Sequence, residues 1–226
     1  MANFKTHLSC GVVLGVICAL VAVIFALIGN DWRDIFLIEL FVILGAVMPD
    51  MDSDSGVPFH VAFGSLAIIS AGFAVFYALT KMPGNYTLLI SYPLGAIFLV
   101  WVVAGHTFKR LTKHRGMAHS IPAAALAGFV VFSGTARIGF SEWESFLFAA
   151  SVAIGYILHL TLDELYSATN FHGHPFVPNK AFGSALKLFS HNHAITVFVY
   201  GLLWFFYSVN GTQISVLGTK LFQMMK

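Results

Sequence analysis

A histidine and an aspartate near the end of one apolar segment are the residues of this chain best placed for chemistry. His159 and Asp163 stand four positions apart, so on a helix they share one face with Cβ atoms about 5–6 Å apart. Imidazole and carboxylate both ligate zinc, so the pair is a candidate for joint ligation of one metal ion. The alternative is a polar helix end with a hydrogen-bonded histidine and a capping aspartate. Two ionisable groups in an apolar segment are costly unless they have a use, which favours the metal site.

An acidic turn follows the second apolar segment. Asp50, Asp52 and Asp54 occupy alternate positions after Pro49, and carboxylates spaced in this way in a turn can converge on a divalent cation. The glutamate that closes an EF-hand loop is missing, which excludes that motif. The alternative is a solvated acidic turn. The sequence predicts Asp50 and Asp52 as metal ligands.

A basic motif precedes the fifth apolar segment. Ser120 is a good helix N-cap, which places His119 beside a helix N-terminus, where free N–H groups favour anions. Arg115 can add a bidentate phosphate contact, and His114 stands next to it. The alternative is a basic loop that rests on lipid headgroups.

The remaining histidines are weaker candidates. His7 stands alone where the first apolar segment begins, and its case rests on the company of the other motifs. Two His-x-His pairs lie in the last polar segment: His172 with His174, and His191 with His193. Two further histidines, His60 and His106, are interpreted as interfacial.

The composition requires an integral membrane protein. Of 226 residues, 58% are hydrophobic and 10% are charged, with a mean hydropathy of +0.83. A soluble domain has about 25% charged residues, so this chain has too little polar surface for one. The 23 phenylalanines exclude a disordered chain. The net charge of +2 gives no reason to expect nucleic-acid binding.

Apolar segments separated by short polar breaks predict an all-α, polytopic transmembrane bundle of about six or seven spans. The second and fifth segments are short for a span, and the second contains Glu39. We expect a single domain over residues 1–226, with an extramembrane loop at 164–193 and an interfacial tail at 212–226. The segments are Leu8–Ile28, Ile35–Met48, Phe59–Leu79, Tyr86–Gly105, Ser120–Ser133, Phe146–Leu162 and Ala194–Val209.

If every segment crosses, the chemistry gathers at one membrane surface. We define face A as the surface that receives residues 1–7, 49–58, 106–119 and 163–193. All 10 histidines fall on face A or at the face-A end of a segment. The 12 lysines and arginines divide seven to five in favour of face A, which by the positive-inside rule favours a cytoplasmic location for it.

The motifs stand in the order seen in one bacterial family. His7, Pro49-Asp50-x-Asp52, His114-Arg115-Gly116-x-x-His119-Ser120 and Gly155-Tyr156-x-x-His159-x-x-x-Asp163 resemble LexA-regulated, membrane-bound metal-dependent hydrolases. The resemblance spans residues 1 to about 170 and implies a multi-pass hydrolase of the inner membrane. The chain departs from the pattern at Ser53, where a histidine is frequent, and at Ala118, where threonine is usual.

The function that we predict is metal-dependent hydrolysis of an ester at face A. Zinc or manganese suits the mixture of imidazole and carboxylate ligands, and the substrate is a phosphoester or a lipid-derived ester. Asp52 or His114 would serve as general base, and Arg115 would hold the anionic part of the substrate. Membrane lipids and a small-molecule or lipid ester are the expected partners. The predicted ligands are His7, Asp50, Asp52, His119, His159 and Asp163.

Two other classes stay open at this point. A transporter of divalent cations or protons would place ionisable groups along a path through the bilayer, whereas only Glu39 lies clearly inside a predicted span. A metal-stabilised membrane scaffold without turnover would use the same ligand types. An open coordination position separates a catalytic from a structural metal site.

Overall fold

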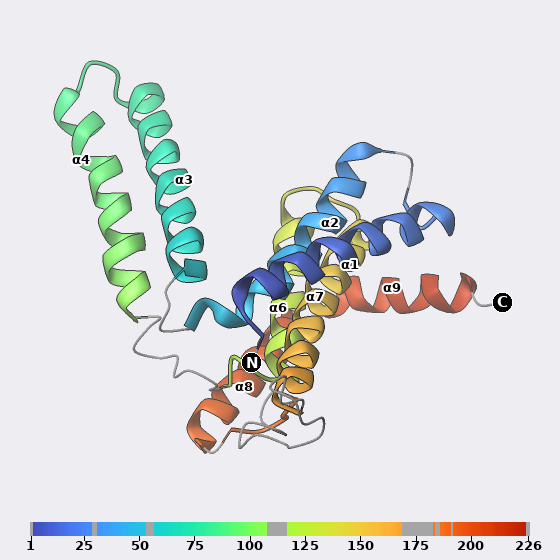
Figure 1. Cartoon of the computed structure of the whole chain (residues 1–226). Coiled ribbons are helices and arrows are strands. Elements are labelled where there is room, and N and C mark those ends of the chain that lie inside the picture. The colour runs from blue at the N-terminus through green and yellow to red at the C-terminus, as the bar shows by residue number, and fades with distance from the viewer. Residues whose placement is uncertain are drawn as a thin grey trace. The chain divides into compact units, whose positions relative to one another are not determined.

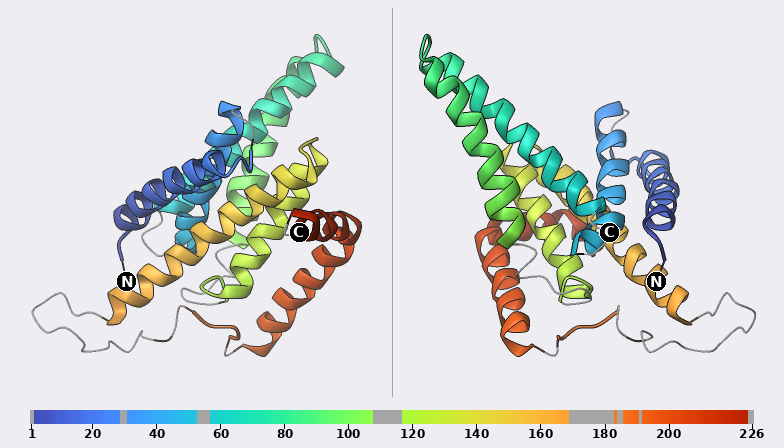
Figure 2. Two further views of the ribbon diagram at one scale, coloured as in Figure 1. Left: turned by 90° about the vertical axis from the view of Figure 1, so that its right-hand side faces the viewer. Right: turned by 60° about the vertical axis from the view of Figure 1, so that its left-hand side comes forward.

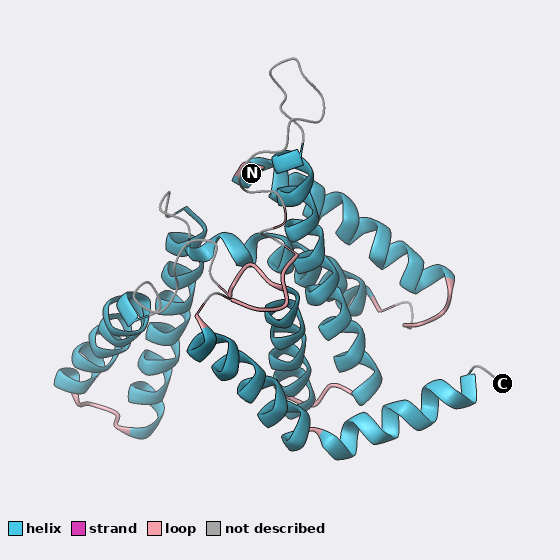
Figure 3. Ribbon diagram, turned by 90° about the horizontal axis from the view of Figure 1, so that it is seen from below, coloured by secondary structure: helices cyan, strands magenta, loops and turns pink. Residues whose placement is uncertain are grey.

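The computed structural model describes residues 2–28, 31–52, 57–107, 117–168, 183, 186–190 and 192–224. Figure 1 shows the chain, and Figure 3 shows that the regular elements of this described part are helices. The one β-type pairing there is an isolated bridge between Ser120 and Lys187. The predicted all-α class is confirmed.

A helix occupies each of the apolar segments predicted from the sequence. Long apolar runs bounded by Gly, Pro and Asn turns form these helices. In chain order the elements are α1 (Phe4–Ile24), α2 (Trp32–Val47), the 3-10 helix η1 (Met48–Asp52), α3 (Val57–Lys81), α4 (Tyr86–Ile97), the π-helix η2 (Phe98–Ala104), α6 (Ile121–Arg137), α7 (Glu142–Ala168), α8 (His193–Val209) and α9 (Gly211–Met224).

Side-chain caps fix where five of these helices begin, three of which belong to the helices around the histidines. The Asn3 carboxamide oxygen accepts from the backbone N–H of Thr6 at 2.8 Å before α1. The Ser120 hydroxyl accepts from the Ala123 N–H at 3.3 Å before α6, as predicted. Asp31 caps α2 in the same way. Each cap satisfies one of the free donors of the first turn.

Four described helical stretches are long and apolar enough to cross a membrane. They are Phe4–Ile24, Phe63–Lys81, Tyr86–Thr107 and Glu142–Ala168. A fifth span is formed if α8 and the start of α9, which bend by 68° from one another, count together. Helices α2 and α6, with 16 and 17 residues, are shorter than the roughly 20 residues that a span needs. The predicted count of six or seven therefore depends on these two helices.

The chain forms two compact units. One contains residues 50–114, in which α3 and α4 with η2 form a helical hairpin. Aromatic rings join its two arms: His60 stacks on Trp101 with centroids 5.4 Å apart, and Phe59 packs on the same indole at 6.4 Å. The other, which we call unit 1, contains residues 1–49 and 115–226.

Helix α7 is the centre of unit 1. It packs against α1, α2 and α6, and Figure 2 shows it running between the N-terminal helices and α6. Its buried Val152, Tyr156 and Leu160 form one core with Ala124 and Ala127 of α6. The helix that carries the His-x-x-x-Asp pair is therefore enclosed by three neighbouring helices.

Polar contacts tie helix ends at other places in unit 1. At the start of α2, the Arg33 guanidinium lies 3.0 Å from the Asp34 carboxylate and 3.2 Å from that of Glu144 on α7. At the junction of α8 and α9, the buried Asn210 carboxamide donates to the Ser133 hydroxyl of α6 at 2.7 Å. These contacts fix the helix ends that lie away from the histidines.

Candidate metal centre

Three histidines and an aspartate of unit 1 come together in its interior. His7 and His159 are 0% exposed, His119 is 1% exposed and Asp163 is 3% exposed. They belong to the start of α1, the turn before α6 and the second half of α7. The predicted convergence of motifs that lie far apart in the sequence is confirmed.

The Asp163 carboxylate is the hub of this cluster. One oxygen, Oδ1, accepts a hydrogen bond from the backbone N–H of Ala2 at 3.2 Å and lies 3.3 Å from His7 Nε2. The other, Oδ2, lies 3.7 Å from His159 Nε2 and 3.9 Å from His119 Nε2. The i, i+4 spacing on α7 does bring the imidazole and the carboxylate together, as predicted.

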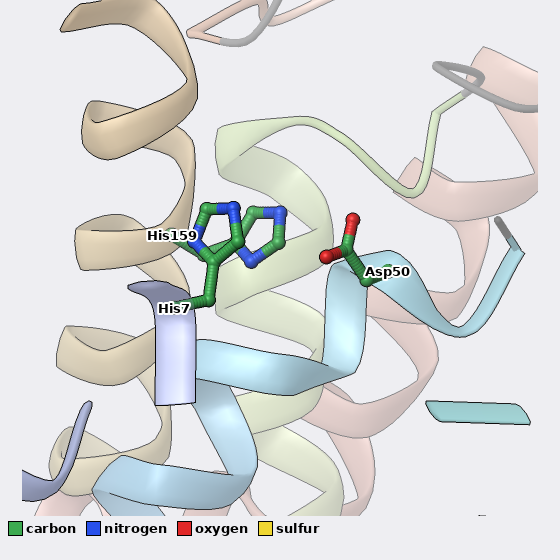
Figure 4. A group of neighbouring side chains, drawn as sticks. All are labelled: His7, Asp50 and His159. Carbon is green, nitrogen blue, oxygen red and sulfur yellow. The ribbon is translucent and has the colours of Figure 1, made fainter. Parts of the chain in front are cut away.

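The imidazole rings are packed on one another. His7 stacks on His159 with ring centroids 3.7 Å apart and planes 15° from parallel, and His119 meets His159 edge-on at 5.5 Å. Figure 4 shows the stacked rings of His7 and His159, with the carboxylate of Asp50 facing them. Imidazole binds a metal ion through a ring nitrogen, and the stacking brings rings from α1 and α7 to the same place.

A backbone carbonyl sets the orientation of His159. Its Nδ1 lies 2.8 Å from the carbonyl oxygen of Ala46, and because a carbonyl only accepts, Nδ1 carries the proton. The lone pair of His159 is then on Nε2, the atom that faces Asp163. Metal-binding histidines generally have their second nitrogen held in this way.

Two glycines allow α2 to come close enough for that bond. A Cβ on Gly155 would overlap the Val42 carbonyl oxygen and stand 3.0 Å from the Ala46 nitrogen. A Cβ on Gly45 would overlap the Val152 carbonyl oxygen. The backbones of α2 and α7 therefore touch at this crossing, and any larger residue would separate them.

His119 is held by the turn that precedes α6. The Ser120 hydroxyl donates to the Met117 carbonyl at 2.5 Å, and the Tyr156 hydroxyl of α7 donates to the Ala118 carbonyl. The N–H of the first α6 residue donates to the Lys187 carbonyl at 3.1 Å. The turn is thus fastened on both sides, so the position of its imidazole is fixed.

Two overlapping groups of side chains have the arrangement of metal ligands. They are His7, Asp50 and His159, and then His119, His159 and Asp163; within each group the ligand atoms lie within 4.8 Å of one another. Asp50 lies in η1, the 3-10 helix that directly follows α2. Because His159 Nδ1 is bonded to Ala46, Nε2 is the nitrogen that His159 would offer to a metal in either group.

Buried polar atoms of the cluster fit a bound cation. Within the described part of the chain, His7 Nδ1 and Asp163 Oδ2 have no hydrogen-bond partner although both atoms are buried. Leaving such an atom unsatisfied costs about 1–3 kcal/mol, and a metal ion would satisfy the lone pairs of both residues. Imidazoles with carboxylates are the ligand set of zinc sites and also suit manganese.

Several predicted residues do not enter this description. The side chain of Asp52, together with His114 and Arg115, lies outside the described residues, as do His172, His174 and His191. His60 belongs to the α3–α4 hairpin, and His193 opens α8 on the surface. The sequence analysis missed the Ala2 N–H, the Ala46 carbonyl and the role of Tyr156.

Comparison with known families agrees with a membrane protein. A family model described as "YdjM inner membrane protein" matches residues 1–222, which is nearly the whole chain. No match was found among curated proteins or among solved structures. The match and the long apolar helices confirm the predicted location as a multi-pass protein of the inner membrane. The description of the family names a location and no reaction.

Proposed function

This chain belongs to the YdjM inner membrane protein family, and we propose that its buried His/Asp cluster is the metal centre of a hydrolase. The observation that carries the proposal is the Asp163 carboxylate, which faces three buried imidazoles with its Oδ2 lacking a hydrogen-bond partner among the described residues. A buried carboxylate requires compensation, and a divalent cation supplies it.

His7, Asp50, His119, His159 and Asp163 would hold zinc or manganese. Because His159 would offer the same nitrogen, Nε2, in either group, the two groups describe one centre rather than two separate ones. A bound ion of this kind polarises an ester and acidifies water, which makes hydrolysis possible near neutral pH. Asp52 and His114 are the proposed general bases, and Arg115 the proposed contact to an anionic substrate group.

The position of the cluster favours chemistry at a membrane surface over transport. Its members sit near one end of the helices: His7 in the second turn of α1, Asp50 after α2, His119 before α6 and Asp163 near the end of α7. Glu39, the carboxylate in the middle of α2, packs beside Gly15 of α1, where an added Cβ would stand 3.0 Å from its Cγ. A phosphoester or a lipid-derived ester presented at the headgroup level is the proposed substrate.

Metal analysis of variants tests the proposal. Purified protein should contain zinc or manganese, and His159→Ala and Asp163→Ala should lose the metal and the activity on a panel of phosphoesters together. Arg115→Ala should keep the metal and lose about 10²–10³ in rate, because arginine is no metal ligand but stabilises an anion. Wild-type metal content in His159→Ala would refute the metal centre. If the protein binds metal but hydrolyses none of the esters, the hydrolase proposal is refuted and the metal-stabilised scaffold is the interpretation that stands.

A further inference from the structure

An apolar pocket lies between α6, α7, α8 and α9 in unit 1. It has a volume of about 450 Å³ and is lined by residues of α6, α7, α8 and α9. Phe132, Phe146 and Leu217 form its walls, and none of its lining residues carries a formal charge. Its size is within the roughly 300–1,000 Å³ of pockets that bind small molecules, but it lacks the polar groups that orient a water-soluble ligand.

Small residues and a fixed bend create this space. Gly128 of α6 and Gly218 of α9 belong to the lining, and a Cβ on Gly218 would have no atom within 4 Å. Helix α9 turns away from α8 by 68°, and the Asn210 side chain locks this corner to Ser133. The pocket is therefore preformed by the backbone and by a buried hydrogen bond.

The pocket is continuous with the surface that contacts lipid. Two wall residues are buried, Phe132 at 4% and Leu217 at 5% exposure, whereas Tyr207, which also lines the pocket, is 50% exposed. Beside Tyr207, with ring centroids 6.2 Å apart, Trp204 of α8 is 71% exposed. In a protein of the inner membrane, apolar side chains exposed in this way face acyl chains, so the pocket opens into the bilayer.

We propose that the pocket binds one acyl chain of a membrane phospholipid. A methylene chain satisfies an apolar lining by dispersion contacts alone, and an unfilled cavity would lose those contacts. A partner helix fits less well, because one helical turn of about 10–12 Å width and 5.4 Å length has the volume of the whole pocket. The inference does not depend on metal binding or on turnover.

Photolabelling in membranes tests the wild-type protein directly. The protein is placed in vesicles of phosphatidylethanolamine and phosphatidylglycerol that carry a diazirine on one acyl chain, and labelled residues are mapped by mass spectrometry. We expect Phe132 and Leu217, which are buried, to be labelled at least as strongly as the exposed Trp204. Labelling confined to exposed residues such as Trp204, or protein–protein adducts at the pocket, would overturn the proposal.

A matched pair of variants tests occupancy. Gly218→Leu adds a side chain to the pocket lining at an open position, whereas Gly201→Leu adds the same side chain to an equally open position of α8 that does not line the pocket. Displacing about two methylenes should lower pocket labelling about tenfold in Gly218→Leu and leave Gly201→Leu like wild type. Ala125→Leu on α6 should repeat the loss. Unchanged labelling in both pocket variants would contradict the proposal, and their metal content should equal that of wild type.

Discussion

Replacing Gly155 with alanine tests whether the closeness of α2 and α7 sets the geometry of the metal centre. The added Cβ would stand 2.9 Å from the Val42 carbonyl carbon and 3.0 Å from the Ala46 nitrogen. Non-bonded heavy atoms normally lie about 3.5–4.0 Å apart, so α2 must move away from α7 by roughly 1 Å. Backbone atoms cannot relax as a flexible side chain would, so the whole helix has to shift.

The shift has two calculable consequences. The bond from His159 Nδ1 to the Ala46 carbonyl, now 2.8 Å, would lengthen by about 1 Å and pass the roughly 3.2 Å limit of a good hydrogen bond. Losing the group that orients a metal-binding histidine lowers metal affinity by about 10–100-fold. Overpacking at the crossing should also lower the free energy of unfolding by about 1–3 kcal/mol.

Metal titration and thermal unfolding separate these consequences. Bound zinc or manganese is measured by mass spectrometry at graded free metal, and unfolding in detergent is followed by the fluorescence of the four tryptophans. Gly134→Ala is the control, because a Cβ there has no atom within 4 Å and helix propensity predicts a gain of up to about 1 kcal/mol. If Gly155→Ala unfolds earlier but binds metal like wild type, the helix crossing does not set the centre. If Gly155→Ala changes neither the metal affinity nor the thermal unfolding, the backbones of α2 and α7 do not touch at Gly155.

Three further variants extend the test to other contacts. Tyr156→Phe removes the donor to the Ala118 carbonyl. In the same two assays it should lower the unfolding free energy by about 0.5–1.5 kcal/mol and weaken metal binding. Unaltered metal affinity would show that this hydrogen bond does not position His119. Asn210→Ala breaks the buried bond to Ser133 and should destabilise the protein by about 1–3 kcal/mol with its metal content intact, whereas loss of metal would tie this corner to the centre. Arg33→Ala removes the partner of the buried Asp34 carboxylate at the opposite helix ends. It should lower the unfolding free energy by about 1–3 kcal/mol and leave metal binding unchanged, whereas a loss of metal would tie these helix ends to the centre.

Apolar periodicity and turn residues were sufficient to locate the helices. Each predicted segment contains a helix, and the Ser120 cap forms where a serine before an apolar run predicts it. Helix length was harder to predict from apolarity, because polar residues extend the ends. Helix α7 runs from Glu142 to Ala168 and so extends beyond both ends of the predicted apolar segment, Phe146–Leu162.

The membership of the candidate centre was also readable, because side chains with chemistry are rare in so apolar a chain. His7 belongs to no local motif, yet it stacks on His159. The presence of the other motifs on the same face was therefore enough to predict it. What escaped prediction belongs to the backbone. The Ala2 N–H and the Ala46 carbonyl are groups that every residue carries, and only the three-dimensional path of α1 and α2 gives them a role.

The glycines mark the limit of such reasoning most clearly. Gly155 was noticed as part of a motif, but the sequence contains 20 glycines, and nothing local separates Gly155 from Gly134. One touches the backbone of α2 and the other faces open space. Only the crossing of two helices distinguishes them.

The hydrogen bond between Ala2 and Asp163 has a consequence for how the chain is made. It joins residues 161 positions apart, so at about 5–20 residues per second α1 is complete roughly 10–30 s before its partner on α7 is synthesised. During that time His7 has neither the Asp163 carboxylate nor the His159 ring beside it. Insertion of α7 is then the event that joins the first helices to the last ones. A nascent chain that stops short of it leaves the polar groups at the start of α1 without the partners that they have in the folded protein.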